Sequence, residues 1–257
     1  PGSGSDAAAL RTRAERTDQG WRLNGVKAFI SGGGYSDAYL TMVRSGGDGP
    51  KGISAVIVED GTPGLSFGGL EDKMGWRAQP TAQVQFDDCQ IPADNLLGGP
   101  GQLNRGFICL MEQLPWERLQ IAIGAVASMQ AAIDQTIAYV NQRQVFGQAL
   151  AAYQNTRWKL AELQTETQVA RVFVDKCIEL LLHERLDTAT ASMAKYWCSD
   201  LQNKVIDECV QLHGGYGYMW ELPVARAWAD ARVQRIYGGT NEIMKEVISR
   251  SLGLGGR

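Results

Sequence analysis

The stretch Phe107–Val126, FICLMEQLPWERLQIAIGAV, decides the fold of the second half of the chain. Its apolar residues recur at helical spacing, which predicts a buried amphipathic helix. A spacing of i, i+4, i+7 and i+11 places four of its residues on one face. These four residues are Leu110, Leu114, Glu117 and Ile121. A carboxylate therefore interrupts an apolar stripe.

Glu117 follows Pro115 by two residues, and a proline inside a helix removes one backbone hydrogen bond. A buried acid beside a helix irregularity contradicts what folding alone selects, and such contradictions favour a functional role. The structural alternative is that Glu117 pairs with Arg118 or extends to the edge of the apolar face. The spacing by itself leaves both interpretations open.

Short β-like runs precede this helix, from Trp21 to about Leu97. Clusters of Gly, Pro and Asp separate them, and the Asn24-Gly25 pair predicts a tight hairpin within WRLNGVKAFIS. Many short strands with turn signals favour a small antiparallel β-barrel or sandwich. Residues 1–100 are therefore predicted to form a β domain.

Helical periodicity dominates the chain from the opening stretch to the end. Asp187 or Thr188 is a plausible N-cap for one of these helices, and Gly214-Gly215 is a suitable stop for it. Long helices joined by short turns predict an antiparallel four-helix bundle over residues 101–257, so the fold class is α+β and multidomain. The expected helices run over Leu103–Gln142, Asn155–Glu184, Asp187–Leu212, Pro223–Tyr237 and Thr240–Leu252.

The composition is that of a globular protein, with 44% hydrophobic and 21% charged residues among 257. A formal net charge of -3 gives no basic footprint for nucleic acid or for an anionic membrane. No apolar run reaches the roughly 18 residues that a membrane span needs. Five cysteines without CxxC spacing favour reduced thiols, and the two histidines argue against a His-based site, so no metal is expected.

Glycine pairs and triplets occur at several points, and none forms a Walker loop or a GxGxxG motif between a strand and a helix. Their default role is in turns and helix stops. The segment Tyr237–Glu242, YGGTNE, differs because two glycines precede an N-cap Thr. Bare amides at a helix N-terminus bind an anion or a polarised oxygen. Two more motifs lie at helix ends, QRQVFG at Gln142–Gly147 and QLHGGYGY at Gln211–Tyr218, and pairing with the helix dipole is the simple alternative for Arg143.

Taken together, PGSGSD, FIS, QRQVFG, QLHGGYGY and IYGGTNEI resemble the acyl-CoA dehydrogenase family, in the family's order and approximate spacing. The family fold is an N-terminal helical domain, a middle β domain and a C-terminal four-helix bundle. This chain matches the last two parts and lacks the first. That agrees with its start at Pro1-Gly2-Ser3, without an initiator Met or a targeting segment, so we expect a piece of a longer protein.

The resemblance implies α,β-dehydrogenation of an acyl-CoA thioester to a trans-2-enoyl-CoA, with FAD as cofactor. In the family a carboxylate removes the pro-R α-proton, flavin N5 accepts the β-hydride, and electron-transferring flavoprotein reoxidises the FAD. This chemistry needs a base whose pKa is raised in a dry site, donors at the thioester oxygen, and a protein that orients the flavin.

The catalytic base has two positions in the family. Most members carry it directly after the Tyr of a Tyr-Glu-Gly-Thr motif, where this chain has Gly238. The long-chain and isovaleryl-CoA dehydrogenase branch carries it on the first bundle helix, in a Glu-Arg pair. This chain has that pair as Glu117-Arg118. Because the apolar stripe marks the same carboxylate independently, Glu117 is the predicted base.

Other site residues are implied by matching position. Those matched to FAD are Ser5, Phe29, Ile30, Ser31, Arg143, Phe146, Gln154, Gln211, Leu212, His213, Gly214, Gly215, Thr240, Asn241 and Glu242. Among them, Arg143, Phe146 and Gln154 resemble the group that holds the FAD pyrophosphate and adenosine across a subunit interface. Those matched to the acyl-CoA are Ser5, Pro50, Lys51, Ile108, Pro115, Trp116, Arg118, Gly238, Gly239 and Arg250.

The resemblance also implies partners and a location. We expect electron-transferring flavoprotein as electron acceptor, a homotetramer, and a role in fatty acid β-oxidation in the cytoplasm of a bacterium or the mitochondrial matrix of a eukaryote. One alternative is an acyl-CoA oxidase of the same fold, in which oxygen reoxidises the flavin. Another is a non-catalytic acyl-CoA-binding or scaffold subunit, favoured by the missing N-terminal domain and by Gly238. The acyl chain length and branching stay open.

Overall fold

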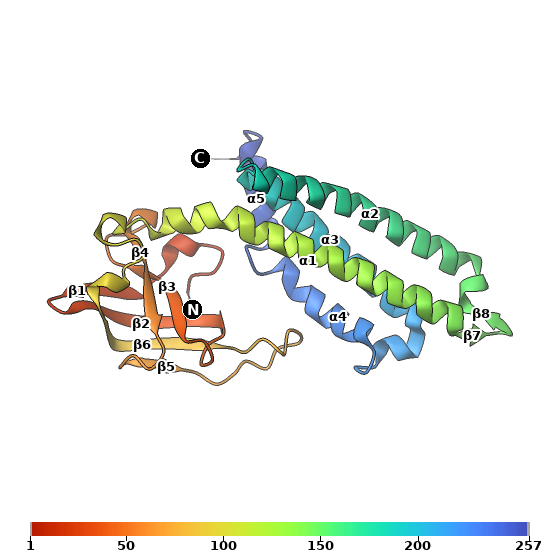
Figure 1. Ribbon diagram of the computed structural model, residues 1–257, viewed down its shortest axis with the longest axis horizontal. Helices are drawn as coiled ribbons and strands as arrows, with labels where there is room; N and C mark the ends of the chain where they lie inside the picture. The colour runs from red at the N-terminus through yellow and green to blue at the C-terminus, as the bar shows by residue number, and fades with distance from the viewer. Residues whose placement is uncertain (1, 256–257) are drawn as a thin grey trace. The chain divides into compact units, whose positions relative to one another are not determined.

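Alternating buried and exposed side chains build the β unit, which comprises the residues up to Gln113. The computed structural model describes residues 2–255, and Figure 1 shows the strands of this unit in red to yellow. Six strands form one sheet in the order β4-β3-β1-β2-β6-β5. Their bounds are Arg13–Thr17 for β1, Gly20–Ser31 for β2, Ala38–Arg44 for β3, Ile53–Glu59 for β4, Leu65–Phe67 for β5 and Thr81–Ile91 for β6.

The sheet is mixed rather than wholly antiparallel. β2 pairs antiparallel with both β1 and β6, whereas β1 pairs parallel with β3 through Arg13 and Arg44. Since β1 and β6 occupy both edges of β2, the returning β3 pairs with the free edge of β1. Buried apolar side chains of five strands form the core of the unit, among them Leu23, Val43, Val58, Val84 and Ile91.

The predicted hairpin at Asn24-Gly25 is wrong, because β2 runs straight through this pair. The side chain of Asn24 donates to Asp88 Oδ1 at 2.9 Å and accepts from the Asp88 N–H at 2.9 Å, next to a register shift between β2 and β6. A Cβ on Gly25 would lie 2.8 Å from Thr12 Cα, so the glycine permits a close approach of backbones. The pair therefore forms a bulge, and the chain reverses instead between Thr17 and Gly20.

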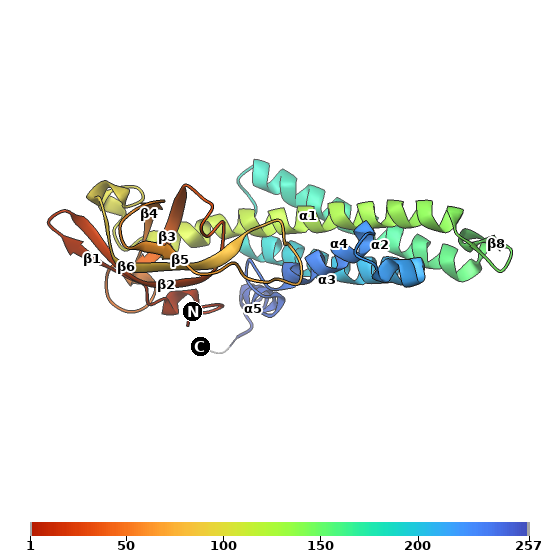
Figure 2. The same cartoon turned by 90° about the horizontal axis from the view of Figure 1, so that it is seen from below.

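The helical unit begins at Leu114, inside the first long helix. The helices are α1 Gly106–Gln142, α2 Gln154–Leu182, α3 Thr188–His213, α4 Pro223–Ala231 and α5 Asn241–Ser251. Figures 1 and 2 show α1, α2 and α3 running alongside one another, joined by short connections. α3 is central, because it packs against α2, α4 and α5 and buries twelve side chains. The predicted order of a β domain and then a helical bundle is confirmed.

The buried face of α1 is not the predicted one. Glu117 and Ile121 are only half-buried, whereas Leu119, Ala122 and Val126 are fully buried against the other helices. The apolar stripe that contains Glu117 therefore lies at the border between core and surface. Pro115 is accommodated inside the helix, which continues on both sides of it.

α1 is also the one described helix that is long and apolar enough, by length and composition, to cross a membrane. The core helix of a protein in water passes the same test, so the observation is weak evidence. Within the helical unit, buried residues of α1 such as Met129 and Ile133 pack against those of other helices. The helical unit itself therefore buries these residues of α1.

Candidate functional site

The carboxylate of Glu117 lies at the surface border of α1, and its charge acts on Arg118, whose pKa it raises against the effect of burial. Neither a hydrogen bond nor an ion pair joins it to any residue between 2 and 255. Its neighbour Arg118 points elsewhere, with 5% of its surface exposed. The Arg118 Nε donates to the Gly238 carbonyl at 3.5 Å, and its Nη1 donates to Ser192 Oγ at 3.2 Å. The alternative in which Glu117 forms a close pair with Arg118 is therefore not the observed arrangement.

Gly238 lies directly against the face of α1 that carries Glu117. A Cβ on Gly238 would lie 2.6 Å from the Cδ1 of Ile121, which is one helical turn after Glu117. The φ of Gly238 is +65°, in the left-handed region that glycine adopts without strain. The two positions that carry the base in different branches of the resembling family therefore flank the same side chain.

Two buried cations hold the turn formed by Gly238 and Gly239. Arg118 reaches the first carbonyl, and the ammonium of Lys195 on α3 donates to the Gly239 carbonyl at 2.7 Å. Lys195 also donates to Asn241 Oδ1 at 2.8 Å, and none of its surface is exposed. Burial lowers the pKa of Lys195 to about 8 and lowers the pKa of Arg118.

The N-terminus of α5 follows this turn directly. Thr240 caps the helix, since its hydroxyl accepts from the Ile243 N–H at 3.3 Å. Asn241 is buried, and its side-chain amide donates to Ser199 Oγ and Asp200 Oδ1, both at 2.9 Å. Hydrogen bonds from its own backbone N–H and from Thr240 lower the pKa of Glu242. The side chain of Asn241 thus faces the interior, so this predicted cofactor residue holds the helix end in place.

Lys195 is the main site residue that the sequence analysis missed. Its partners on the glycine turn come more than 40 residues later in the chain, so no local motif connects them. One signal was available, because Lys195 shares a helical face with Ala191, Ala194 and Cys198, which are all buried. A lysine on an otherwise apolar face is unfavourable for folding alone, as a carboxylate such as Glu117 on an apolar stripe is, and so favours a functional role.

A second cluster lies around the other end of α3. The Arg143 guanidinium lies 5.8 Å from the ring centre of Tyr216, and the His213 ring stacks on Tyr139 at 4.3 Å. His213 is buried, and its Nδ1 lies 2.8 Å from the Cys209 carbonyl. The exposed residues of this cluster are Arg143, Phe146, Gln154, Gln211, Gly214 and Gly215, with Leu212 half-buried.

Phe146 is 98% exposed at the tip of a hairpin formed by β7 (Gln144–Val145) and β8 (Gln148–Ala149). A Cβ on Gly214 or Gly215 would meet no atom within 4 Å, so bare backbone is open there. An exposed aromatic ring, a guanidinium and open backbone together suit a stacked base and a phosphate. His213 follows Lys195 by eighteen positions on α3, which is about 27 Å along the helix axis. The predicted cofactor residues of the helical unit thus form two separate groups.

In the β unit the predicted segment Phe29–Ser31 lies at another register shift of β2. Phe29 has a φ of +57° and is 75% exposed, and Ser31 is exposed while Ile30 is half-buried. A cavity of about 670 Å³ adjoins this segment, with Gly4, Phe29 and Ile30 in its wall. Ser5 is exposed directly beside Gly4. A bulge therefore displays an aromatic ring at the edge of a cavity.

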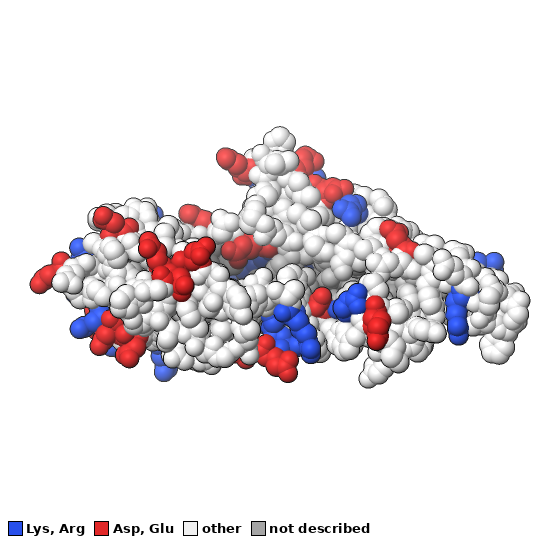
Figure 3. Space-filling view, turned by 60° about the horizontal axis from the view of Figure 1, so that its bottom comes forward, with Lys and Arg blue, Asp and Glu red and all other residues white. Residues whose placement is uncertain are grey.

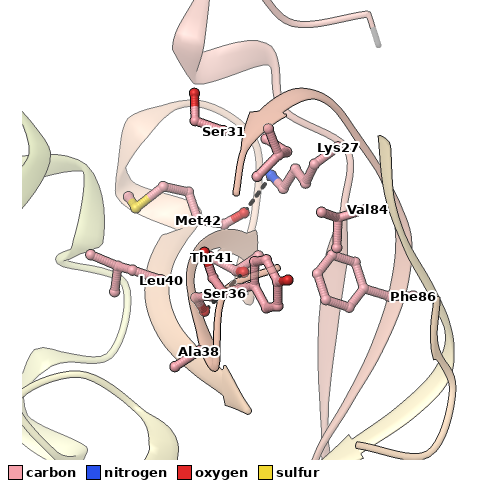
Figure 4. A pocket seen from close by; sticks show the side chains of 11 residues that line it. Lys27, Ser31, Ser36, Ala38, Leu40, Thr41, Met42, Val84 and Phe86 are labelled. Carbon is pink, nitrogen blue, oxygen red and sulfur yellow. Dashed lines mark hydrogen bonds between the residues drawn. The ribbon is translucent and has the colours of Figure 1, made fainter. Parts of the chain in front are cut away.

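A second cavity of the β unit, of about 290 Å³, shares Ile30 and Met42 with the first as lining residues; Figure 4 shows this second cavity. Lys27 lines both cavities, and its ammonium donates to the Met42 carbonyl at 2.6 Å, as the dashed line in Figure 4 shows. Burial lowers the pKa of Lys27 to about 8. The sequence analysis did not identify this lysine, because within β2 it occupies an ordinary strand position.

The remaining predicted substrate residues lie at the surface of their units. Pro50 and Lys51 are exposed in a 3-10 turn, and Arg250 is exposed on α5 and pairs with Glu246 at 2.7 Å. Ile108 and Trp116 are exposed on α1, while Pro115 is half-buried. On the face that Figure 3 shows, basic and acidic side chains are interspersed and form no continuous field. Over residues 2–255 no three His, Cys, Asp or Glu side chains gather as a metal site would require.

Comparisons with known proteins cover both units. Residues 1–89 match the family model for the middle domain of acyl-CoA dehydrogenases, and residues 104–253 match the model for the C-terminal domain. The chain is 49% identical over 255 residues to the mitochondrial long-chain specific acyl-CoA dehydrogenase of Mus musculus, covering 98% of this chain and 59% of that protein. It is 43% identical over 253 residues to the mitochondrial isobutyryl-CoA dehydrogenase of Bos taurus, covering 98% of this chain and 60% of that protein.

A comparison of structures also finds similar proteins. The crystal structure of an acyl-CoA dehydrogenase from Geobacillus kaustophilus has a TM-score of 0.95 and 40% identity, covering 99% of this chain and 67% of that one. The chain thus spans about three-fifths of the length of the curated relatives that it matches.

Proposed function

Because the chain belongs to the acyl-CoA dehydrogenase family, we propose that it supplies the β and helical units of an FAD-dependent enzyme that converts an acyl-CoA thioester to its trans-2-enoyl-CoA. The observation that carries the proposal is Glu117, a half-buried carboxylate without a hydrogen bond or ion pair among residues 2–255 that flanks the glycine turn at Gly238. A family member without a base at position 238 needs another carboxylate nearby, and Glu117 meets that need.

The described residues fit FAD. Phe29 offers an exposed ring at a cavity of the β unit, and Phe146, Arg143 and the open backbone at Gly214 offer a stacking surface and a phosphate site. When bound, FAD supplies the redox step by accepting the β-hydride of the substrate. The groups around Lys195 and around His213 lie at opposite ends of α3, which favours an arrangement in which the hairpin group serves the cofactor of a neighbouring subunit.

Glu117 removes the α-proton in this proposal. Substrate bound over this border face would exclude water from the carboxylate. Trp116 is an exposed apolar side chain next to Glu117 and suits contact with an acyl chain. Arg118, which the resemblance places at the substrate, donates to the Gly238 carbonyl.

The substrate class of this protein is a proposal that rests on the names of its relatives. One relative is named for long-chain and another for isobutyryl substrates, so straight and branched acyl groups both stay open. We further propose that electron-transferring flavoprotein accepts the electrons and that the full-length protein is a homotetramer. Its proposed location is the cytoplasm of a bacterium or the mitochondrial matrix of a eukaryote. A turnover panel of straight C4 to C16 and branched acyl-CoAs on the full-length protein would define the substrate.

The test of the proposal is the variant Glu117→Gln in the full-length FAD-loaded protein. We expect it to retain FAD and to bleach the flavin with acyl-CoA at least 10²- to 10⁴-fold more slowly, the usual contribution of a general base. Glu112→Gln is the matched control, because Glu112 is an exposed carboxylate on the same helix. Bleaching of Glu117→Gln at the parent rate would exclude Glu117 as the base.

Two further outcomes would replace the proposal. Purified full-length protein without a flavin spectrum would favour a non-catalytic acyl-CoA-binding subunit. Rapid reoxidation of the substrate-reduced protein by air, with release of peroxide, would favour an acyl-CoA oxidase. Slow reoxidation by air and fast reoxidation by electron-transferring flavoprotein are expected for the dehydrogenase.

A further inference from the structure

The side chain of Lys27 points into the interior of the β unit. Lys27 on β2 pairs with Val84 on β6, so the two side chains lie on the same face of the sheet, and Val84 belongs to the buried apolar core. Burial lowers the pKa of Lys27 to about 8. Placing an ammonium in such surroundings costs free energy that a methionine of similar volume would not cost. The charge therefore calls for a reason besides packing.

One reason is structural, and it uses one of the three N–H donors of the ammonium. The pairing of β1 with β2 ends at Asn24, and its pairing with β3 is confined to Arg44. The later part of β2 and the earlier part of β3 are therefore unpaired on that side. The Lys27 ammonium bridges them by donating to the Met42 carbonyl at 2.6 Å (Figure 4). For its other two N–H donors no acceptor is found among residues 2–255.

The space beside the ammonium is the cavity of about 290 Å³ that Figure 4 shows. Apolar side chains of β2, β3 and β6 form much of its wall, namely Ile30, Ala38, Leu40, Met42, Val84 and Phe86. Ser36 also lines the cavity, and its hydroxyl makes no hydrogen bond to any residue between 2 and 255. Ordered water alone would satisfy the ammonium but would leave the apolar wall hydrated. A ligand with one polar end and one apolar end suits both parts of the cavity.

We propose that this cavity binds a short-chain monocarboxylate, whose carboxylate accepts from the Lys27 ammonium while its alkyl tail lies against the apolar wall. A charge-assisted hydrogen bond of this kind is about twice as strong as a neutral one. Among residues 2–255, Lys27 is the one charged side chain that lines this cavity, so a phosphate would bring a second negative charge that nothing there neutralises. The cavity of about 290 Å³ has room for a four-carbon acid, because about 150 Å³ accommodates benzene.

Binding should be linked to the protonation of Lys27. The other titratable side chains in the walls of the two cavities that Lys27 lines are Tyr39 and Arg11. The Tyr39 hydroxyl is engaged with the backbone of Gly32 and Gly34, and Arg11 is exposed. A bound carboxylate favours the charged amine and so raises the pKa of Lys27 again. Binding near pH 8 should therefore take up protons, and above pH 8 the affinity should fall about tenfold per pH unit.

The experiment is isothermal titration calorimetry of the full-length FAD-loaded protein. The ligands are acetate, propanoate and butanoate, with 1-butanol and butylammonium as neutral and cationic analogues. We expect the affinity to rise about fourfold for each added methylene. Butanoate should bind at least about tenfold more tightly than either analogue, because a hydrogen bond to a charged group contributes that much. Repeating the butanoate titration at pH 8 in two buffers of different ionisation enthalpy measures the proton uptake.

Variants of Lys27 test whether the binding occurs at this cavity. Lys27→Met removes the ammonium, and Lys27→Gln keeps an N–H donor for the Met42 carbonyl without the charge, so it carries the test where Lys27→Met does not fold. Both should weaken butanoate binding at least about tenfold and abolish the proton uptake. Lys176→Met is the control, because it removes an exposed lysine that pairs with Glu179 on α2, and it should change neither. Saturating trans-2-enoyl-CoA should not displace butanoate from a site apart from the acyl-CoA site.

The proposal is overturned where butanoate shows no saturable binding, where 1-butanol binds as tightly, or where folded Lys27 variants bind butanoate as Lys176→Met does. Displacement by the enoyl-CoA also overturns it, because the cavity then belongs to the active site. Where neither Lys27 variant folds, the parent protein decides, and a lack of proton uptake at pH 8 overturns the proposal. These binding measurements need no proton removal by Glu117, so they fail independently of the proposed function.

Discussion

Moving the base from residue 117 to residue 238 tests whether carboxylates at the two positions reach the same region of the site. The change is Glu117→Gln with Gly238→Glu, made with and without Ile121→Val. A side chain at a φ of +65° costs about 1–2 kcal/mol. The new Cβ would lie 2.6 Å from Ile121 Cδ1, and overpacking of this kind costs about 1–3 kcal/mol. Gly238→Glu alone should therefore lower the free energy of unfolding by about 2–5 kcal/mol.

Ile121→Val removes the Cδ1 that obstructs the new side chain. By itself it should cost about 0.5 kcal/mol, the lower end for Ile→Val, because Ile121 is half-buried. Combined with Gly238→Glu it should restore about 1–3 kcal/mol, measured as a coupling energy by urea unfolding in a double-mutant cycle. Gly253→Glu is the matched control, since Gly253 has a φ of +76° and open space around its Cβ position. Its cost should not respond to Ile121→Val.

The rate of flavin bleaching by acyl-CoA should depend on the same contact between positions 121 and 238. The triple variant, which combines Glu117→Gln, Gly238→Glu and Ile121→Val, should bleach flavin faster than Glu117→Gln alone, within the 10²- to 10⁴-fold that a general base contributes. Two results would refute the reasoning. One is a coupling energy below about 0.5 kcal/mol between positions 121 and 238, which would mean that the two sites are independent. The other is a folded, FAD-loaded triple variant with no gain in bleaching.

Three further predictions concern stability. Ile133→Ala should lower the free energy of unfolding in urea by about 2–5 kcal/mol, whereas Ile137→Ala, 39% exposed one turn later, should cost less than about 1 kcal/mol; equal losses would contradict the described core. Asp187→Ala should cost about 1 kcal/mol through loss of the N-cap at neutral pH. Because the folded pKa of Asp187 lies below its ordinary value, this difference should be full above pH 4 and vanish as the pH falls through the folded pKa, and a loss without pH dependence would contradict it. Lys27 has a folded pKa of about 8 against 10.5 unfolded, so the unfolded chain binds more protons between these values. The unfolding free energy of the parent relative to Lys27→Met should then rise from pH 8 to pH 10.5, by about 1–2 kcal/mol after allowance for partial exposure, and a fall would contradict the buried ammonium.

Local signals in the sequence predicted the helices well, because each signal acts within a few residues. Asp187, one of two candidate caps with Thr188, caps α3 through the Thr190 N–H at 2.9 Å, and Thr240 caps α5 as predicted. The family motifs extended this success to the order of the two units, which the comparisons confirm. The roles of the predicted site residues stay predictions.

Features that depend on distant residues were not predictable from one sequence. Asn24-Gly25 has the residues of a hairpin turn, but Asp88, 64 residues later, offers both hydrogen-bond partners and converts the pair to a bulge. The buried face of α1 also turned out differently, because packing by α2 and α3 decides which stripe is covered. Lys195 was missed for the same reason, since its carbonyl partner is Gly239.

The length of α3 fixes the distance between two parts of the helical unit. Lys195 and His213 lie on this one rigid helix, and inserting a single residue between them would turn one group by about 100° and shift it by about 1.5 Å. Loops absorb such changes, whereas this helix has buried side chains along its whole length. Relatives of different overall length should therefore vary in their loops and keep the count of seventeen residues between these two positions. Engineering that lengthens or shortens the protein should leave α3 intact for the same reason.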